Sequence, residues 1–206
     1  MEAVLVGAIV LASLLLAYLA YQALMGSPRG VRRRFAKLPV THVADAVSPG
    51  FYRFEGRVRA IGEVPVSQAS GRAYVARDLR IVPFDGGDSA GTRSAQQAVD
   101  FLVDDGTGVA LVRAGRAAVA IDRDFEAPRS TLDRLPWVDE LLREGGYVNV
   151  SPETCRIRLY EGVLSPGDPV GVIGQVEPAD REARALGAAV VVSARAVAPG
   201  GDPPAV

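Results

Sequence analysis

One long apolar segment opens the chain. Residues 3–25 carry no charge and consist mostly of Ala, Val, Leu and Ile. A helix of this length spans roughly 35 Å at about 1.5 Å per residue, which exceeds the bilayer hydrocarbon core of about 30 Å. Tyr18 and Tyr21 lie near its C-terminal end, where tyrosine suits the membrane interface. The pattern therefore predicts one transmembrane helix within an anchor of residues 1–28, with the bilayer contacting residues 3–25.

A basic cluster follows this segment. It contributes five of the 23 Lys and Arg residues, namely Arg29, Arg32, Arg33, Arg34 and Lys37. A cleaved signal peptide would need basic residues before a shorter apolar stretch, whereas this chain begins Met-Glu-Ala. By the positive-inside rule we expect a single-pass protein of the plasma membrane, with its N-terminus outside and its soluble domain in the cytoplasm. The cluster is interpreted either as a topology signal alone or also as a contact for anionic lipid head groups.

Beyond a basic juxtamembrane linker at 29–49, the pattern is typical of β-strands. Residues 54–62 and 73–83 alternate apolar and polar side chains, as half-buried strands do. The turn Asp105-Gly106-Thr107-Gly108 stands between two apolar runs and predicts a hairpin. The further segments expected to be strands are 99–104, 109–113, 117–122, 155–164, 169–176 and 188–197.

Only one segment has a clear helical pattern. Ser130 or Thr131 can cap a helix that runs to about residue 144, and residues 178–186 form either a loop or a short helix. Short strands with Gly-rich turns favour a mainly β fold, either a partly open barrel or a sandwich of about eight strands with one helix. We expect this β-rich domain to cover 50–198 and to be followed by a disordered tail at 199–206.

Composition restricts the chemistry. The 206 residues carry a net charge of −1, and residues 38–206 carry −5 once Glu2 and the five basic residues of the cluster are removed. This balance argues against a nucleic-acid-binding protein. The single cysteine, Cys155, and the single histidine, His42, exclude a zinc site of the usual Cys/His kind within the chain. They also leave little for a Ser/His/Asp or Cys/His catalytic arrangement, and no cofactor motif is present.

Several short motifs resemble a known family. They are Glu55-Gly56 with Gly62, Ser70-Gly71, Arg77, Asp104-Asp105-Gly106 with Gly108, Glu161-Gly162, Pro166-Gly167-Asp168 and Gly174. In this order they resemble the GIDE domain, also called the BAM ("beside a membrane") domain, over roughly residues 50–180. That domain forms the membrane-adjacent part of a mitochondrial E3 ubiquitin ligase and occurs in many prokaryotic membrane proteins.

The resemblance implies a β-rich accessory module held at a membrane. The ligase itself carries a RING, which needs about eight Cys and His ligands for two zinc ions. This chain has two such residues, so we expect a stand-alone member of the prokaryotic type without transferase chemistry.

Two pairs of charged residues are candidates for chemistry. Asp104 and Asp105 form either a cation or acid/base site or an ordinary turn that accepts backbone hydrogen bonds, and the turn is favoured because consecutive strand residues point to opposite faces. Glu161 and Arg77 either pair across the sheet or present a ligand site, and the sequence does not decide between them.

Three single residues and one loop have both a functional and a structural interpretation. His42 is either a proton switch or a linker or helix residue, and Cys155 is either a nucleophile or a small buried hydrophobe. Trp137 either anchors a partner or the bilayer interface, or packs its helix on the sheet. Asp85 and Asp88 resemble half a calcium loop without the closing Glu, so no metal site is expected.

The sequence therefore predicts a membrane-anchored binding or scaffolding module that is not an enzyme and has an unknown protein partner. Exposed strand edges or the surface around Trp137 are the expected docking places. Two alternatives remain open. One is an enzyme, either of the E3 ubiquitin transferase type or with a carboxylate site at Asp104 and Asp105. The other is a protein of the opposite topology that binds lipid or peptidoglycan.

Overall fold

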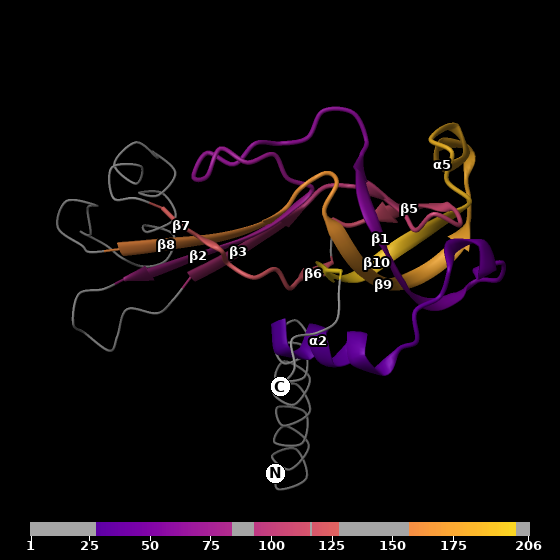
Figure 1. Ribbon diagram of the computed structural model, residues 1–206, viewed down its shortest axis with the longest axis horizontal. Helices are drawn as coiled ribbons and strands as arrows, with labels where there is room; N and C mark the ends of the chain where they lie inside the picture. Colours follow the sequence, from indigo (N-terminus) through magenta and orange to yellow (C-terminus); the bar gives the residue numbers. More distant parts are fainter. Residues whose placement is uncertain (1–27, 84–92, 116, 128–156, 201–206) are drawn as a thin grey trace, which may run out of the picture.

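The fold consists of a β-barrel and a second β-sheet that extends from it (Figure 1). A computed structural model describes residues 28–83, 93–115, 117–127 and 157–200. The barrel strands are β1 (Gly50–Ala60), β4 (Phe101–Asp104), β5 (Val109–Arg113), β9 (Pro169–Pro178) and β10 (Val190–Pro199). The second sheet contains β2 (Ala76–Pro83), β3 (Arg93–Ala98), β7 (Phe125–Glu126) and β8 (Ile157–Leu164), and β6 (Ala118–Val119) pairs with β10. The helices among the described residues are α2 (Pro28–Lys37), the 3-10 helix η1 (Val43–Asp45) and α5 (Arg181–Ala185).

The barrel is closed. Its hydrogen-bonded order is β5-β4-β1-β9-β10, and β10 returns to β5 through a parallel pairing. This is a five-stranded Greek-key order of the OB type. The expected mainly β fold with a barrel is thus confirmed, and the parallel pairing of β10 with β5 joins the first and last strands of the barrel order.

Apolar side chains from all five strands fill the barrel. Phe54 and Val58 point inward from β1, while the residues between them in the alternation are more exposed. The other strands contribute similar side chains, chiefly Phe101, Val103, Ala110, Val112, Val170, Val172, Val190, Val192 and Val197. Val43 of η1 adds to this core from outside the strands.

The second sheet has the order β3-β2-β8-β7. β2 pairs with β8 along its whole length, from Ala76 opposite Leu164 to Pro83 opposite Ile157. β8 leads directly into barrel strand β9 through the turn at 165–168, so the two sheets are covalently continuous. β3 and the two-residue β7 were not expected from the sequence, because β3 reads Arg-Ser-Ala-Gln-Gln-Ala and has no apolar alternation.

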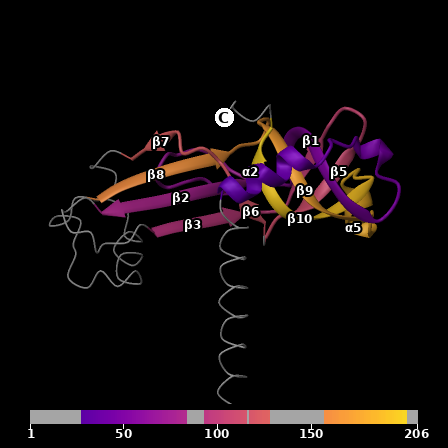
Figure 2. The ribbon, with the colours of Figure 1, turned by 90° about the horizontal axis from the view of Figure 1, so that it is seen from below.

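The first part of the segment expected to be a linker forms the helix α2. Val31 and Phe35 are buried at helical spacing, and they pack with Ile173 and Ala196 on the outside of the barrel. Pro28 stands in the first turn, where its missing N–H is not needed, and Pro39 lies just beyond the end of the helix. Viewed from below, α2 lies across the barrel strands (Figure 2).

One further expected element is a helix, and several others lie outside the described residues. Residues 178–186 contain the short helix α5, which Asp180 caps by accepting a hydrogen bond from the Ala183 N–H at 2.7 Å. Of the tail expected at 199–206, Pro199 is the last residue of β10. The rest of that tail from residue 201, the expected helix at 130–144, the loop at 85–92 and the apolar run at 3–25 lie outside the described residues. Within the described part, no helix is both long and apolar enough to cross a membrane.

Packing of α2 depends on the absence of a side chain at Gly171. A Cβ there would lie 2.6 Å from Phe35 Cε1, closer than packed carbon atoms approach each other. Gly171→Ala is expected to destabilise the protein by about 1–3 kcal/mol, because Phe35 must move away from β9. The measurement is the free energy of unfolding in urea.

A double-mutant cycle tests this cause. In a Phe35→Ala background, Gly171→Ala is expected to be neutral or stabilising, since alanine is better than glycine within a strand. Gly115→Ala is the matched control, because nothing lies within 4 Å of the added Cβ. An equal loss from Gly171→Ala in both backgrounds would contradict the proposed contact.

Candidate functional site

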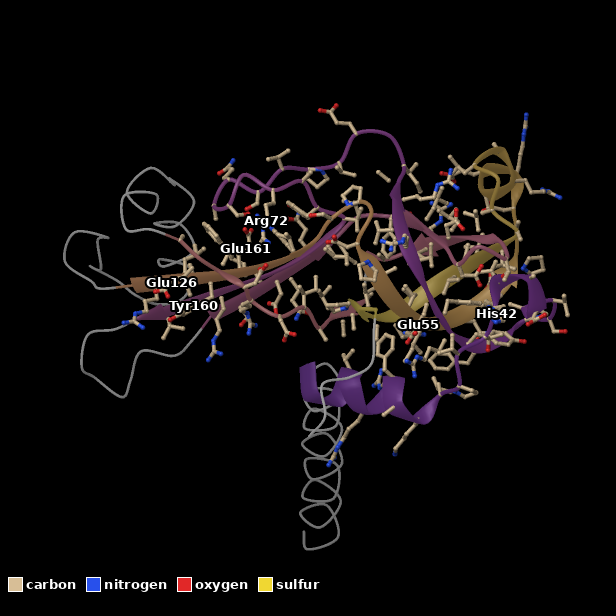
Figure 3. The ribbon with its side chains drawn as sticks, in the orientation of Figure 1. His42, Glu55, Arg72, Glu126, Tyr160 and Glu161 are labelled. Carbon is tan, nitrogen blue, oxygen red and sulfur yellow. The ribbon has the colours of Figure 1, made fainter. Side chains whose placement is uncertain are left out.

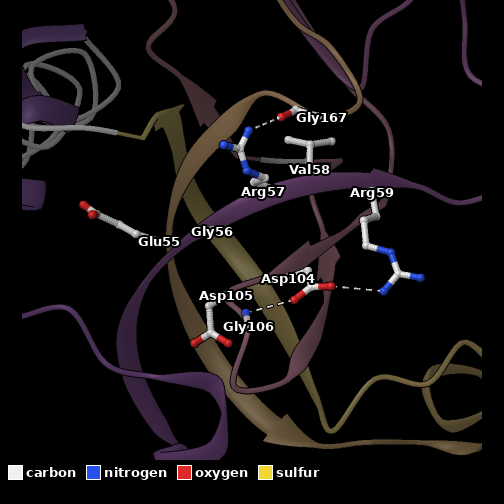
Figure 4. Close-up of a pocket in the computed structure, with 9 residues that line it drawn as sticks. All are labelled: Glu55, Gly56, Arg57, Val58, Arg59, Asp104, Asp105, Gly106 and Gly167. Carbon is white, nitrogen blue, oxygen red and sulfur yellow. Dashed lines mark hydrogen bonds and ion pairs between the residues drawn. The ribbon is translucent and has the colours of Figure 1, made fainter.

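Three of the family-like motifs meet on the outside of the barrel. Glu55-Gly56 belongs to β1, Asp104-Asp105-Gly106 forms the end of β4 and its turn, and Gly167 lies in the turn before β9. Together with Arg57, Val58 and Arg59, these residues line an open depression of about 580 Å³ (Figure 4). Since the three segments are distant in sequence, the barrel topology alone brings them together.

The two aspartates of the hairpin stabilise the turn. Asp104 Oδ1 accepts a hydrogen bond from the Gly106 N–H at 2.9 Å. Asp105 Oδ1 accepts from the Thr107 N–H at 2.8 Å, the Thr107 hydroxyl at 2.7 Å and the Gly108 N–H at 2.9 Å. These bonds confirm the turn interpretation of the Asp104-Asp105 pair.

Asp105 also joins the hairpin to η1. Its other carboxylate oxygen, Oδ2, accepts from the Val43 N–H at 2.8 Å, which is one of the unpaired donors at the start of η1. Burial opposes ionisation of Asp105, but the hydrogen bonds from Val43, Thr107 and Gly108 outweigh it, so the pKa of Asp105 is lowered. The charged form is therefore the one that holds the hairpin and η1 together.

His42 has a partner that the sequence did not reveal. Its Nδ1 lies 3.6 Å from Asp105 Oδ2, and its side chain is 64% exposed while that of Asp105 is 4% exposed. His42 stands at the N-cap of η1 without capping it through its side chain. His42 therefore lies between α2 and β1, within the segment expected to be a linker.

Ion pairs and backbone contacts occupy the charged groups around the depression. Arg57 Nη1 donates to the Gly167 carbonyl at 3.0 Å, and Arg59 Nη1 donates to Asp104 Oδ2 at 3.2 Å. Glu55 pairs with Arg53, whose guanidinium also reaches the Phe35 and Leu38 carbonyls at the end of α2. The depression is thus bordered by charges of both signs, and Glu55, Arg57 and Arg59 each already have a partner within the protein.

Two Glu-Gly motifs have the same packing role in different sheets. At Gly56 of β1, an added Cβ would lie 2.5 Å from the Asp104 carbonyl oxygen. At Gly162 of β8, it would lie 2.3 Å from the Asp122 carbonyl oxygen. Each glycine therefore admits a crossing backbone at close range, which explains the residue type without a ligand.

The other motifs lie in or beside the second sheet. Glu161 is fully buried, and the Ser67 hydroxyl donates to its Oε1, while no described residue forms a hydrogen bond with the buried Oε2. The Ser67 Oγ in turn accepts from the Ala69 N–H at 3.1 Å, so it holds the turn that contains Ser70 and Gly71. Arg72, which precedes β2, lies close enough to Glu161 of β8 to interact with it electrostatically (Figure 3).

Arg72 fixes this turn from the outside. It makes two hydrogen bonds of 2.9 Å to Asp124, and this pairing raises the pKa of Arg72 and lowers that of Asp124. Arg77 faces Val163 in the register, and its guanidinium carbon lies 5.1 Å from the centre of the Tyr74 ring. The partners found for Glu161 and Arg77 are therefore Ser67 and Tyr74 rather than each other.

Asp78 is a buried charge that sequence reasoning missed. Its side chain is inaccessible to solvent, and Arg123 Nη2 lies 2.7 Å from its Oδ2. Burial raises the pKa of Asp78, and Arg123 offsets this effect only in part. Alternation along the strand expected at 73–83 is consistent with a solvent-facing Asp78, but the segment at 117–123 covers that side of the sheet.

The remaining motif residues also have structural roles. Asp168 Oδ2 accepts from the Ser165 N–H at 2.7 Å and closes the turn that contains Pro166 and Gly167. Gly174 faces the irregularity in β10, where a Cβ would lie 2.5 Å from the Ser193 carbonyl oxygen. A Cβ on Gly108 would contact Val43, and Gly62 lies just after β1.

Other candidates lie outside the described residues, namely Asp85, Asp88, Trp137 and Cys155. Within the described ranges, no three His, Cys, Asp or Glu side chains are grouped so as to hold a metal ion.

Comparison with other proteins does not indicate a function. No protein-family model, curated protein or solved structure matches this chain. A function can therefore be inferred only from the geometry of the described residues. In the described part, polar residues of the motifs stabilise turns, neighbouring strands and η1 through hydrogen bonds. Such contacts can form a rigid surface with a fixed orientation.

Asp105 gives a test of the main polar contact at this site. Asp105→Asn is expected to destabilise the protein by about 1–3 kcal/mol at pH 7, because the hydrogen bonds to a charged acceptor are weakened. A carboxylate with a lowered pKa stabilises the fold above its unfolded pKa of about 3.9 and loses this contribution as the pH falls toward its folded value. The measurement is the urea unfolding free energy at pH 7 and pH 3, and the difference between the two proteins is expected to shrink in acid. Asp45→Asn, at an exposed position of η1, is the control. A deficit of the same size at both pH values would contradict the role of the charge.

Proposed function

We propose that this protein is a membrane-anchored, non-catalytic binding or scaffolding module similar to the GIDE domain. The observation that carries the proposal is the packing of α2 on the barrel. Pro28, its first residue, follows the last residue of the apolar run, Met25, by three positions. An apolar run inserted in a bilayer would therefore hold the barrel in a fixed attitude beside the membrane.

The use of polar residues in the motifs supports a binding role over a catalytic one. Asp104, Asp105 and Asp168 accept hydrogen bonds within their own turns, and Glu161 accepts from Ser67 inside the second sheet. A general base or a nucleophile must instead reach a substrate. We therefore assign these residues to the shape of the module.

A partner strand can add to β3. β3 ends the strand order of the second sheet, and Ser94, Ala95, Gln96 and Gln97 are exposed. The strand contains no Pro, Asp, Glu or Lys, which are residues that commonly protect sheet edges from pairing. In the part of the chain that the structure describes, this edge carries no further strand, so it suits recognition by strand addition.

The orientation proposed from the basic cluster remains N-terminus outside and barrel in the cytoplasm, at the plasma membrane. A cysteine at Ala185, an exposed position of α5, reports this orientation when Cys155 is replaced by Ser. A membrane-impermeant maleimide is expected to label Ala185→Cys only after the cells are lysed. Efficient labelling of intact cells would reverse the topology and move the search for partners to the cell envelope.

The binding role is tested by crosslinking in the host membrane. A photo-crosslinking residue at Ala95 of β3 is expected to give discrete protein adducts, whereas the same residue at Ala185 of α5 is not. Ser94→Lys is expected to remove the Ala95 adducts, because a lysine on an edge strand opposes strand addition. Equal adducts at both positions, or adducts that persist in Ser94→Lys, would contradict β3 as the binding edge.

A further inference from the structure

The outward face of α2 is a basic ridge. Arg33 and Lys37 are four positions apart, so they lie on one side of the helix, and both are exposed. Val31 and Phe35 lie on the opposite side and are buried against the barrel. Since α2 contains no acidic residue, positive charge on this ridge is not neutralised within the helix.

The ridge is fixed relative to the barrel. Arg53 of β1 donates to the Phe35 and Leu38 carbonyls, which are among the unpaired acceptors at the C-terminal end of α2. Its guanidinium carbon also lies 5.5 Å from the centre of the Phe35 ring. With Phe35 seated over Gly171, these contacts prevent the helix from rotating independently of the barrel.

The chain length places this ridge near the bilayer surface if residues 3–25 span the membrane. Three residue steps separate Met25 from Pro28, and an extended chain covers at most about 11 Å over that distance. α2 must therefore begin within the head-group layer or directly beside it. Basic side chains act on an anionic surface over a Debye length of about 8–10 Å, so the reach is sufficient.

Apolar side chains are exposed beside the C-terminal end of the helix. Val40 bridges to Arg53 of β1 and is 46% exposed, and Phe51 lies on the same outer side of β1 and is 47% exposed. A basic helix with nearby apolar groups is typical of surfaces that lie in a membrane interface.

We propose that the α2 ridge binds anionic lipid head groups, so that the barrel rests on the membrane through α2. This inference rests on the proposed anchoring of the chain. Lipid is the occupant that the structure favours, because the short connection brings the ridge to the bilayer before any other partner and because apolar side chains flank it.

The test uses the full chain in lipid nanodiscs with Cys155 replaced by Ser. A fluorophore at Ala36→Cys, an exposed position of α2, reports on the ridge without removing a charge, and the same label at Ala185→Cys on α5 is the matched control. The nanodiscs contain phosphatidylcholine alone or with phosphatidylglycerol, and a small fraction of lipid carries a quencher on its head group.

We expect strong quenching at position 36 and not at position 185, and only in the anionic nanodiscs. Arg33→Glu with Lys37→Glu is expected to lower the ratio of surface-bound to free barrel by more than about tenfold, at roughly a factor of five per charge. Arg181→Glu with Arg184→Glu makes the same charge change on α5 and is expected to have no effect. Added salt is expected to weaken the contact in the unaltered protein, which tests the charge without any substitution on α2.

The outcomes separate this inference from the proposed function. A chain that enters the nanodiscs but shows no quenching at position 36 overturns the lipid contact and leaves the anchor in place, and this is also the result expected if the ridge serves an acidic protein. Quenching that is insensitive to salt and to Arg33→Glu with Lys37→Glu overturns the role of the ridge. A chain that does not enter the nanodiscs overturns both.

Discussion

The pairing of β1 with two different strands is the constraint on which the rest of the structure depends. Gly50 through Arg57 pair with β9, and Arg57 through Ala60 pair with β4, so one strand joins the two halves of the barrel. The change of partner occurs beside Gly56, where the Asp104 carbonyl approaches too closely for any side chain. The outward residues of β1 then organise the surface: Arg53 holds α2, and Arg57 and Arg59 hold the neighbouring turns.

Local patterns predicted most of the barrel, because its strands alternate or form short apolar runs and its main hairpin contains Asp-Gly. They failed where local pattern does not determine structure. β3 is polar along its length and is a strand only because β2 offers it a complete set of partners. The segment of α2 was predicted to be a linker because basic residues are its most prominent feature. Val31, Phe35 and Leu38 nevertheless follow the helical spacing of a buried face.

The candidate site was predicted as a set of residues but not as an arrangement. The motifs named the depression-lining residues Glu55, Gly56, Asp104 and Gly167, yet nothing in their spacing indicates that they meet. The sequence did not predict contacts between residues that are distant along the chain. An example is the hydrogen bond from the Val43 N–H to the Asp105 carboxylate, which joins residues 62 positions apart. Asp78 was missed for a related reason, since alternation describes one strand and does not report what covers it.

If the proposed anchor holds the chain at a bilayer, the separation of charge between α2 and the rest of the molecule would orient the barrel on an anionic surface. Residues 38–206 carry a net charge of −5, so most of the body is repelled by an anionic surface, while α2 is attracted to it. A flexible tether would let the repelled body turn away from the membrane and lose the attraction of its few basic groups. Phe35, Gly171 and Arg53 hold α2 rigidly on the barrel. Attraction of α2 to an anionic surface and repulsion of the rest of the protein would therefore favour the same orientation. The second sheet, which extends from the barrel beyond α2, would then point in one fixed direction relative to the membrane surface (Figure 1).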